Sequence, residues 1–232
     1  MLEEKREELF QLYQTWEKQL KETSPWLVTE KYSHPYYLHI PDNWFNVKNR
    51  ILIVGEEGFG VKQFDLPIVE AQEFNKNYLL KQLSGSADNH SPFWMRIRKI
   101  ASLPDTSVAW TNLDKIHHSR KRGCALKKYE RKALHQTPTA ILGEEIRLLE
   151  PTIVVYFGWY GISLKAELPS VFYELYPGGL KDYSQWKEKK MKAIEQDGIH
   201  YIFTYHPGWG QRIKGYEDKV MKVIADALKC NL

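Results

Sequence analysis

Three short stretches of the sequence combine a side chain that can do chemistry with residues typical of a turn or strand end. Two adjacent carboxylates, Glu56 and Glu57, follow Gly55 and can orient a water molecule or stabilise a cation. Asn112 can offer one acceptor and two donors to the edge of a planar ligand. His206 can donate a hydrogen bond to a developing anion. These groups can act together only if the fold brings them to one place.

The stretch Gly55-Glu56-Glu57-Gly58-Phe59-Gly60 does not have the pattern of a phosphate-binding loop. Its glycine spacing differs from the dinucleotide fingerprint, and it lacks the Gly-Lys-Ser/Thr end of a P-loop. Two carboxylates at this point would also repel a phosphate. A charged pair at the end of a buried strand instead lies where open α/β sheets bind their ligands. The alternative interpretation is a solvated turn with exposed glutamates.

The stretch at residues 204–212 is predicted to hold an imidazole at the end of a strand. Pro207 fixes its own φ and favours an extended conformation at His206. The glycines on either side of Trp209 allow close approaches that other residues resist. A bulky indole between two glycines has little local packing, which favours a role in binding. The alternative is a turn whose indole packs back on the core.

The elements that must position these groups follow from hydrophobic patterns. Apolar runs with high β propensity predict four strands, at residues 51–54, 108–110, 153–157 and 200–203. Helical spacing predicts helices at residues 1–22, 68–83, 93–101, 138–149 and 216–228. This alternation predicts a three-layer α/β/α fold with a central four-stranded parallel sheet. The carboxyl ends of parallel strands share one edge, so the carboxylates, Asn112, Gly158 and His206 are expected to meet there.

The chain is predicted to form one domain over residues 1–232, since no linker, repeat or low-complexity tract divides it. Residues 1–50 are interpreted as an N-terminal helix and an extended arm that pack on this domain. The region at residues 168–190 is predicted to be irregular and then helical.

Composition limits the function classes. The 232 residues carry a net charge of +4, 13% aromatic residues and 2 cysteines. The two cysteines are too few for an iron–sulfur or metal signature, and no apolar run approaches membrane-spanning length. We therefore expect a cytoplasmic protein without a cofactor, a metal or a membrane partner. We also expect a monomer. The mild positive charge is compatible with a polyanionic partner.

A strongly basic segment follows the second predicted strand. Such a segment can contact a phosphate backbone, which supplies affinity without sequence information. The alternative is a solvated surface. The cations interpreted as contacts to DNA are Lys115, Arg120, Lys121 and Arg122.

From Ile51 onward, the order and spacing of these stretches resemble the uracil-DNA glycosylase superfamily. In that family one strand ends in a Gly-x-Asp/Asn/Ala-Pro-type motif that handles the attacking water. A second ends in a Thr-Asn or Leu-Asn motif whose Asn reads the flipped base, a third ends in Gly, and a fourth ends in His-Pro-Ser. The corresponding stretches here are residues 55–60, 111–112, 144–158 and 206–208.

The resemblance implies a uracil-DNA glycosylase-like fold and a DNA glycosylase that excises uracil or another deaminated or damaged base. Such an enzyme rotates the base out of the duplex before it acts. Asn112 would bind the Watson–Crick edge of the base, and Phe59 or Phe64 would supply a stacking or gating face. Glu57, or failing that Glu56, would orient water and stabilise the cationic sugar.

In the same resemblance His206 would stabilise the departing base as an anion. Trp209 would fill the gap left in the base stack. Gly55 and Gly158 would line the substrate site, and Arg212 would contact DNA.

The chain also departs from the family pattern, because Gly58 replaces the expected Pro and Gly208 replaces the expected Ser. These departures leave two alternatives open. One is a nucleic-acid-binding protein of the same fold with weak or no catalysis. The other is a nucleoside or nucleotide hydrolase, for which a closed site without a basic rim is expected.

Overall fold

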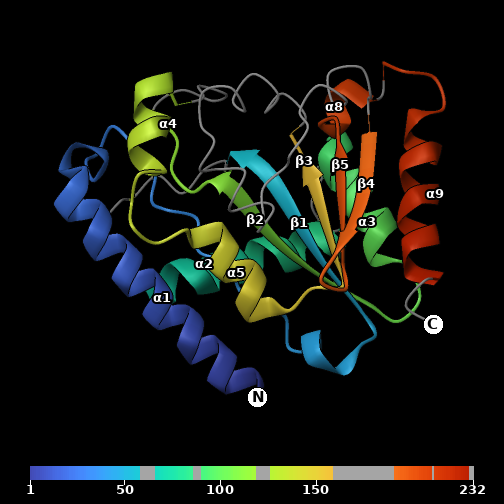
Figure 1. The fold of residues 1–232 in the computed structure, drawn as a ribbon, viewed down its shortest axis with the longest axis horizontal. Helices are drawn as coiled ribbons and strands as arrows, with labels where there is room; N and C mark the ends of the chain where they lie inside the picture. The colour runs from blue at the N-terminus through green and yellow to red at the C-terminus, as the bar shows by residue number, and fades with distance from the viewer. Residues whose placement is uncertain (58–65, 86–89, 119–125, 159–190, 211, 230–232) are drawn as a thin grey trace.

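The structure, a computed structural model, describes residues 1–57, 66–85, 90–118, 126–158, 191–210 and 212–229 (Figure 1). Its centre is a five-stranded sheet in the order β2-β1-β3-β5-β4. The four predicted strands are confirmed and pair in parallel. The strands are β1 (Asn49–Glu57), β2 (Thr106–Asp114), β3 (Ile153–Phe157), β4 (Met191–Gln196) and β5 (Ile199–Thr204).

The predicted four-stranded sheet is corrected by β4, which pairs antiparallel with β5 at one edge. Asp197 and Gly198 form the turn between these strands, with φ values of 53° and 76°. Two consecutive positive φ angles are typical of an Asp-Gly hairpin. The mixed polar sequence of β4 lacks the apolar run that identifies the other strands. The Asp-Gly pair is therefore the sequence signal that reveals it.

The predicted helices at residues 1–22, 68–83, 93–101 and 216–228 are confirmed to within a residue, and the helix predicted at 138–149 begins later, at Ile141. A helix at residues 128–134 was not predicted, because it lies in the basic segment. None of the described helices has the length and apolar character needed to cross a membrane. The helices are α1 (Leu2–Thr23), α2 (Ile68–Leu83), α3 (Pro92–Ala101), α4 (Lys128–Leu134), α5 (Ile141–Leu149), α8 (Pro207–Gly210) and α9 (Tyr216–Lys229).

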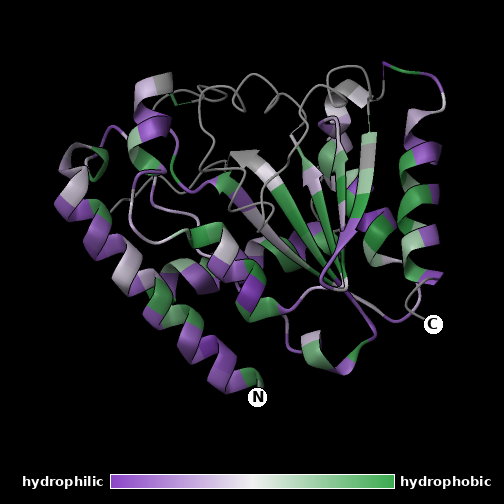
Figure 2. Cartoon of the chain, in the orientation of Figure 1, coloured by the Kyte–Doolittle hydropathy of each residue, from purple (hydrophilic) through white to green (hydrophobic). Residues whose placement is uncertain are grey.

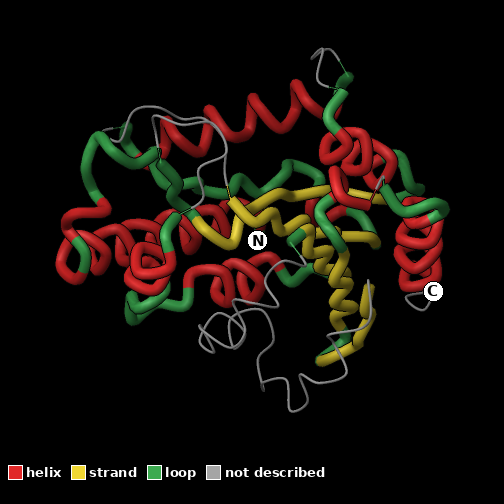
Figure 3. The backbone as a smooth tube through the Cα atoms, turned by 90° about the horizontal axis from the view of Figure 1, so that it is seen from above, coloured by secondary structure: helices red, strands yellow, loops and turns green. Residues whose placement is uncertain are grey.

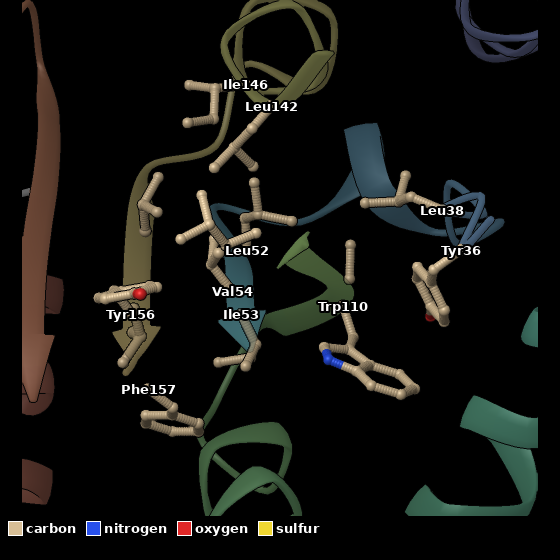
Figure 4. Close-up of a cluster of buried hydrophobic side chains, with 14 of the residues drawn as sticks. Tyr36, Leu38, Leu52, Ile53, Val54, Trp110, Leu142, Ile146, Tyr156 and Phe157 are labelled. Atoms are coloured by element: carbon tan, nitrogen blue, oxygen red, sulfur yellow. The ribbon is translucent and has the colours of Figure 1, made fainter. Parts of the chain in front are cut away.

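Helices cover both faces of the sheet, as an α/β/α arrangement requires (Figure 3). Side chains along a strand alternate between the faces. Leu52 and Val54 of β1 point toward Leu142 and Ile146 of α5, whereas Ile53 points to the opposite face (Figure 4). All five are buried, and the central strands form the hydrophobic middle of the molecule (Figure 2). This two-sided burial explains why the strands read as continuous apolar runs.

The strand order places a topological switch point between β1 and β3. From β1 the chain crosses to β2 on one side, and from β2 it returns past β1 to β3 on the other side. Open α/β sheets bind ligands outside the carboxyl ends of their strands at such a point. The sheet therefore favours a binding site beside the ends of β1 and β3.

The N-terminal region packs on the domain through one face of α1. Leu9, Tyr13, Trp16 and Leu20 are its buried residues, at the helical spacing that the sequence predicts. After α1 the chain forms two short 3-10 turns, η1 (Pro25–Leu27) and η2 (Trp44–Asn46). Between these turns it runs beside residues 115–118, where the backbone N–H of Tyr36 donates to the Lys115 carbonyl at 2.7 Å.

A buried ion pair joins β2, α1 and α5. The Lys115 Nζ atom lies 2.6 Å from Glu145 Oε2, and both side chains are almost completely buried. Tyr13 Oη donates to the other carboxylate oxygen at 2.6 Å, and Thr111 Oγ1 donates to Oε2 at 2.9 Å. The prediction that Lys115 contacts DNA is therefore wrong. Its ammonium lies inside the protein, where Glu145 neutralises it.

Replacing Lys115 with Met is expected to lower the free energy of unfolding by about 3–5 kcal/mol, because it leaves the Glu145 carboxylate buried without its cation. Denaturant unfolding followed by circular dichroism measures this change. The matched control is Arg147→Ala, which breaks the exposed Arg147–Glu144 pair on α5, the helix that also carries Glu145. That loss is expected to stay below about 1 kcal/mol. Equal losses in the two variants would contradict the buried pair.

Candidate functional site

Gly55 and Asn112 lie opposite each other at the carboxyl ends of β1 and β2, because the parallel register pairs them. A Cβ atom on residue 55 would come within 2.4 Å of Asn112 Oδ1 and 3.3 Å of Trp110 Nε1. Only glycine leaves room here for the amide. Asn112 lies inside β2 rather than in a loop after it, so its backbone is fixed by the sheet.

The Asn112 amide is buried without satisfying its hydrogen-bonding groups. Neither Oδ1 nor Nδ2 has a partner among the described residues, although the residue is completely buried. An unsatisfied buried polar group costs about 1–3 kcal/mol, and most buried polar groups have partners. A ligand bound at the carboxyl ends of the strands could supply partners to this amide. The amide offers that ligand an acceptor and two donors.

The Phe93 ring lies between the strand that carries Asn112 and the side chain of His206, and it contacts both. Its ring lies parallel to the imidazole of His206, at 5.8 Å between centroids and 14° between planes. The same ring makes edge contacts with Trp110 at 5.9 Å and Phe157 at 5.6 Å. Aromatic residues from α3, β2 and β3 therefore gather near the carboxyl edge. Trp110 and Phe157 are buried, so the half-buried Phe93 is the ring that can offer a planar ligand a stacking surface.

Phe93 stands at this place because α3 begins just before it. Ser91 is the N-cap, and its side chain accepts from the Trp94 N–H. Pro92 occupies the first helical position, where its missing N–H is not needed. The sequence predicts this helix but does not identify Phe93 as a site residue. The sequence signal that could have identified Phe93 is its position in the first turn of a helix that begins with a Ser-Pro cap.

His206 is held in a defined tautomer. Its Nδ1 atom accepts the backbone N–H of Gly208 at 3.2 Å, so the neutral ring carries its proton on Nε2. Burial, and then the positive charge of Arg96, lower the pKa of His206 below its usual value of 6.5. The imidazole is therefore neutral at pH 7 and can donate a hydrogen bond from Nε2.

His206 directly precedes a single helical turn, α8, whose Gly210 N–H donates to the His206 carbonyl at 3.1 Å. A Cβ on residue 208 would lie 3.3 Å from His206 Nδ1, and one on residue 210 would lie 2.8 Å from the Tyr216 ring. Glycine at these two positions thus lets the backbone approach both rings closely.

Arg96 holds the residues around His206 in place through its contacts. The sequence does not identify it as a site residue. Its side chain is completely buried, and Nε donates to Glu217 Oε2 of α9 at 2.8 Å. Nη1 donates to the Tyr205 carbonyl at 3.3 Å, and the guanidinium lies 5.2 Å from the centre of the Phe157 ring. Arg96 therefore links α3, α9, β3 and the residue before His206.

The third predicted glycine, Gly158, follows β3 directly. It is buried, and a Cβ there would come within 2.6 Å of the Tyr156 hydroxyl. The backbone of Glu56 and Glu57 belongs to the last part of β1, beside Asn112 and Asp114 of β2. The structure thus brings Gly55, Asn112, Gly158 and His206 to the predicted edge of the sheet.

Other predicted site residues lie outside the described part of the chain, so their roles stay predictions. Arg212 is described and exposed. No group of three or more potential metal ligands occurs within the described residues. The residues outside the description are Phe59, Phe64, Arg120, Lys121 and Arg122, together with the side chains of Glu56, Glu57 and Trp209.

No model of a protein family matches this chain, and no curated protein matches it.

Replacing Asn112 with Leu, which has nearly the same shape, is expected to raise the free energy of unfolding by about 1–3 kcal/mol, because it removes an unsatisfied buried amide. Denaturant unfolding again supplies the measurement. The matched control is Asn75→Leu, since Asn75 is also buried but donates to the Tyr37 carbonyl at 2.8 Å. This control is expected to be destabilised. A loss of stability in both variants would mean that the Asn112 amide is satisfied.

Proposed function

We propose that this protein is a DNA glycosylase that hydrolyses the N-glycosidic bond of uracil or another deaminated or damaged base. The proposal is supported by the buried amide of Asn112, which lies beside Gly55 at the carboxyl edge of the sheet and has no partner among the described residues. A nucleobase is planar and presents donors and acceptors along one edge. It can therefore supply the partners that this amide lacks.

The base must first leave the DNA stack. Rotation out of the duplex costs a few kcal/mol, and the cost is least for a mispaired or single-stranded base. In the proposal the flipped base stacks against Phe93 while its edge forms hydrogen bonds with Asn112. Trp110 and Phe157 support the Phe93 ring from two sides, which limits its movement.

Bond cleavage then places positive charge on the sugar and negative charge on the departing base, as in other glycoside hydrolysis. His206 is neutral and carries its proton on Nε2, so it donates a hydrogen bond to the base as negative charge develops. A neutral donor suits this role because it stabilises the anion without requiring a proton to be released.

A carboxylate is proposed to stabilise the sugar cation and orient the attacking water. Glu57, or alternatively Glu56, is the candidate, because the end of β1 lies beside Asn112. Glu reaches further than Asp by one methylene group, and a misplacement on the order of 1 Å can lower a rate a hundredfold. A Glu at this position, in place of the Asp found in the family motif, is therefore expected to affect the rate of the proposed reaction.

The test is strand cleavage of single-stranded and mispaired oligonucleotides that carry uracil, hypoxanthine or xanthine, after heat and alkali convert abasic sites to breaks. Asn112→Ala and His206→Ala are each expected to lower the rate on the order of a hundred- to a thousandfold. Because the neutral imidazole is the active form, the rate should fall only at pH below 6.5, as His206 becomes protonated.

His200→Ala is the matched control, since His200 lies near the amino end of β5, the strand that precedes His206, and its replacement should leave the rate unchanged. Binding of each oligonucleotide is measured in parallel. Salt-sensitive binding of DNA by the wild-type protein without cleavage would contradict the proposed catalysis. That outcome would favour a nucleic-acid-binding protein of this fold.

A further inference from the structure

A second group of aromatic and basic side chains lies on α4 and η1, outside the site described above. Trp26 of η1 is 39% exposed and Tyr129 of α4 is 59% exposed. Their rings contact each other at 6.0 Å between centroids and 37° between planes. Single exposed aromatic residues are common. Here, however, the fold brings together two exposed rings from segments that lie far apart in the sequence. We call this pair the aromatic platform.

A cation contacts the aromatic platform, and two more exposed lysines lie close to it in the sequence. Lys127 Nζ lies 5.9 Å from the centre of the Tyr129 ring, within the range of a cation–π contact. Lys132 of α4 and Lys31, which follows η1 and directly precedes Tyr32, are also exposed. Aromatic rings interleaved with exposed cations are the combination with which proteins bind single-stranded nucleic acids, because bases stack on the rings while the cations contact phosphates.

A buried carboxylate holds the aromatic platform together. Glu130 accepts hydrogen bonds from Tyr32 Oη at 2.9 Å and from the Lys127 backbone N–H at 2.6 Å, and lies 3.0 Å from His118 Nε2. The ring of Tyr32 in turn contacts the ring of Trp26 at 6.1 Å. The two exposed rings are therefore fixed from beneath, which lowers the conformational entropy that a ligand must overcome.

The aromatic platform is also fixed relative to the candidate site. Asp114, the last residue of β2, bonds to Arg131 Nε at 2.5 Å and to His135 Nε2 at 2.9 Å, and both partners lie at or just after α4. Asn112 is in the same strand. Figure 1 shows α4 on the side of the molecule toward which β1, β2 and β3 point. A strand whose base occupies the site can thus extend toward α4.

We propose that Trp26 and Tyr129 stack unpaired bases of a single-stranded DNA segment that adjoins the base bound at Asn112. The proposal deepens the glycosylase proposal and rests on its claim that DNA is the partner. Stacking is tolerant of sequence, because every base has an aromatic face. The platform therefore assigns single-stranded DNA as the favoured substrate class.

The experiment measures binding of two labelled oligonucleotides of about 12 nucleotides, a length within the range that single-strand-binding folds cover. One is oligothymidylate without a damaged base, and the other is a chain of the same length made of abasic sites. Trp26→Ala and Tyr129→Ala are each expected to weaken oligothymidylate binding roughly five- to hundredfold. Binding of the abasic chain should not change, and Tyr129→Phe should bind both like the wild type.

Phe74→Ala is the matched control, because Phe74 is a similarly exposed aromatic residue, 47% exposed, on α2. It should bind oligothymidylate like the wild type. The proposal is overturned if the wild-type protein does not bind oligothymidylate, as expected for a surface that binds another protein. It is also overturned if the platform variants bind normally or lose affinity equally for the abasic chain.

The same set of proteins separates this proposal from the glycosylase proposal. Cleavage reports on the site at Asn112, whereas the difference in binding between oligothymidylate and the abasic chain reports on the platform. If the wild-type protein cleaves no substrate but the platform variants lose base-dependent binding, the catalytic proposal fails and the platform stands. If cleavage is normal and the platform variants bind normally, the platform fails and the catalytic proposal stands.

Discussion

The fit between Gly55 and the amide of Asn112 is the constraint on which the candidate site depends. The parallel register of β1 and β2 brings these residues face to face, and the absence of a Cβ on Gly55 gives the amide its space. The amide is thereby buried without a partner among the described residues. Natural proteins commonly keep such a locally unfavourable feature where a ligand completes it, and offset the cost elsewhere.

Several buried polar groups around the site stabilise the structure that holds Asn112 and His206 in place. Arg96 ties the His206 turn to α9, while the Lys115–Glu145 pair ties the end of β2 to α5. Asp114 extends the same support to α4. Each charge is paired, as burial requires. The rigid sheet thus presents one amide and one neutral imidazole, and the surrounding helices keep the geometry that selective binding of a planar ligand needs.

The sequence predicts the four central strands well because their two-sided burial produces apolar runs, and parallel strands leave little choice about where their ends meet. It misses β4, whose residues are mixed in polarity. It also misplaces Lys115, because nothing local reveals that its partner is Glu145, 30 residues away. The same limit hides Arg96, whose partner Glu217 lies 121 residues later. Local patterns thus identify the edge of the sheet, but only long-range pairing shows which charges are buried beneath it.

The most direct test of this account observes the side-chain amide of Asn112 by NMR in isotope-labelled protein. The ligand is a single-stranded oligonucleotide that carries 2′-fluoro-2′-deoxyuridine, which resists cleavage because the fluorine disfavours positive charge on the sugar. On binding, the Asn112 amide protons are expected to move downfield, as they gain an acceptor, whereas an oligonucleotide with an abasic site in place of the base should leave them unmoved. Amide protons that are already hydrogen-bonded in the free protein, or that stay unchanged while the oligonucleotide binds, would contradict the proposed contact between Asn112 and the base.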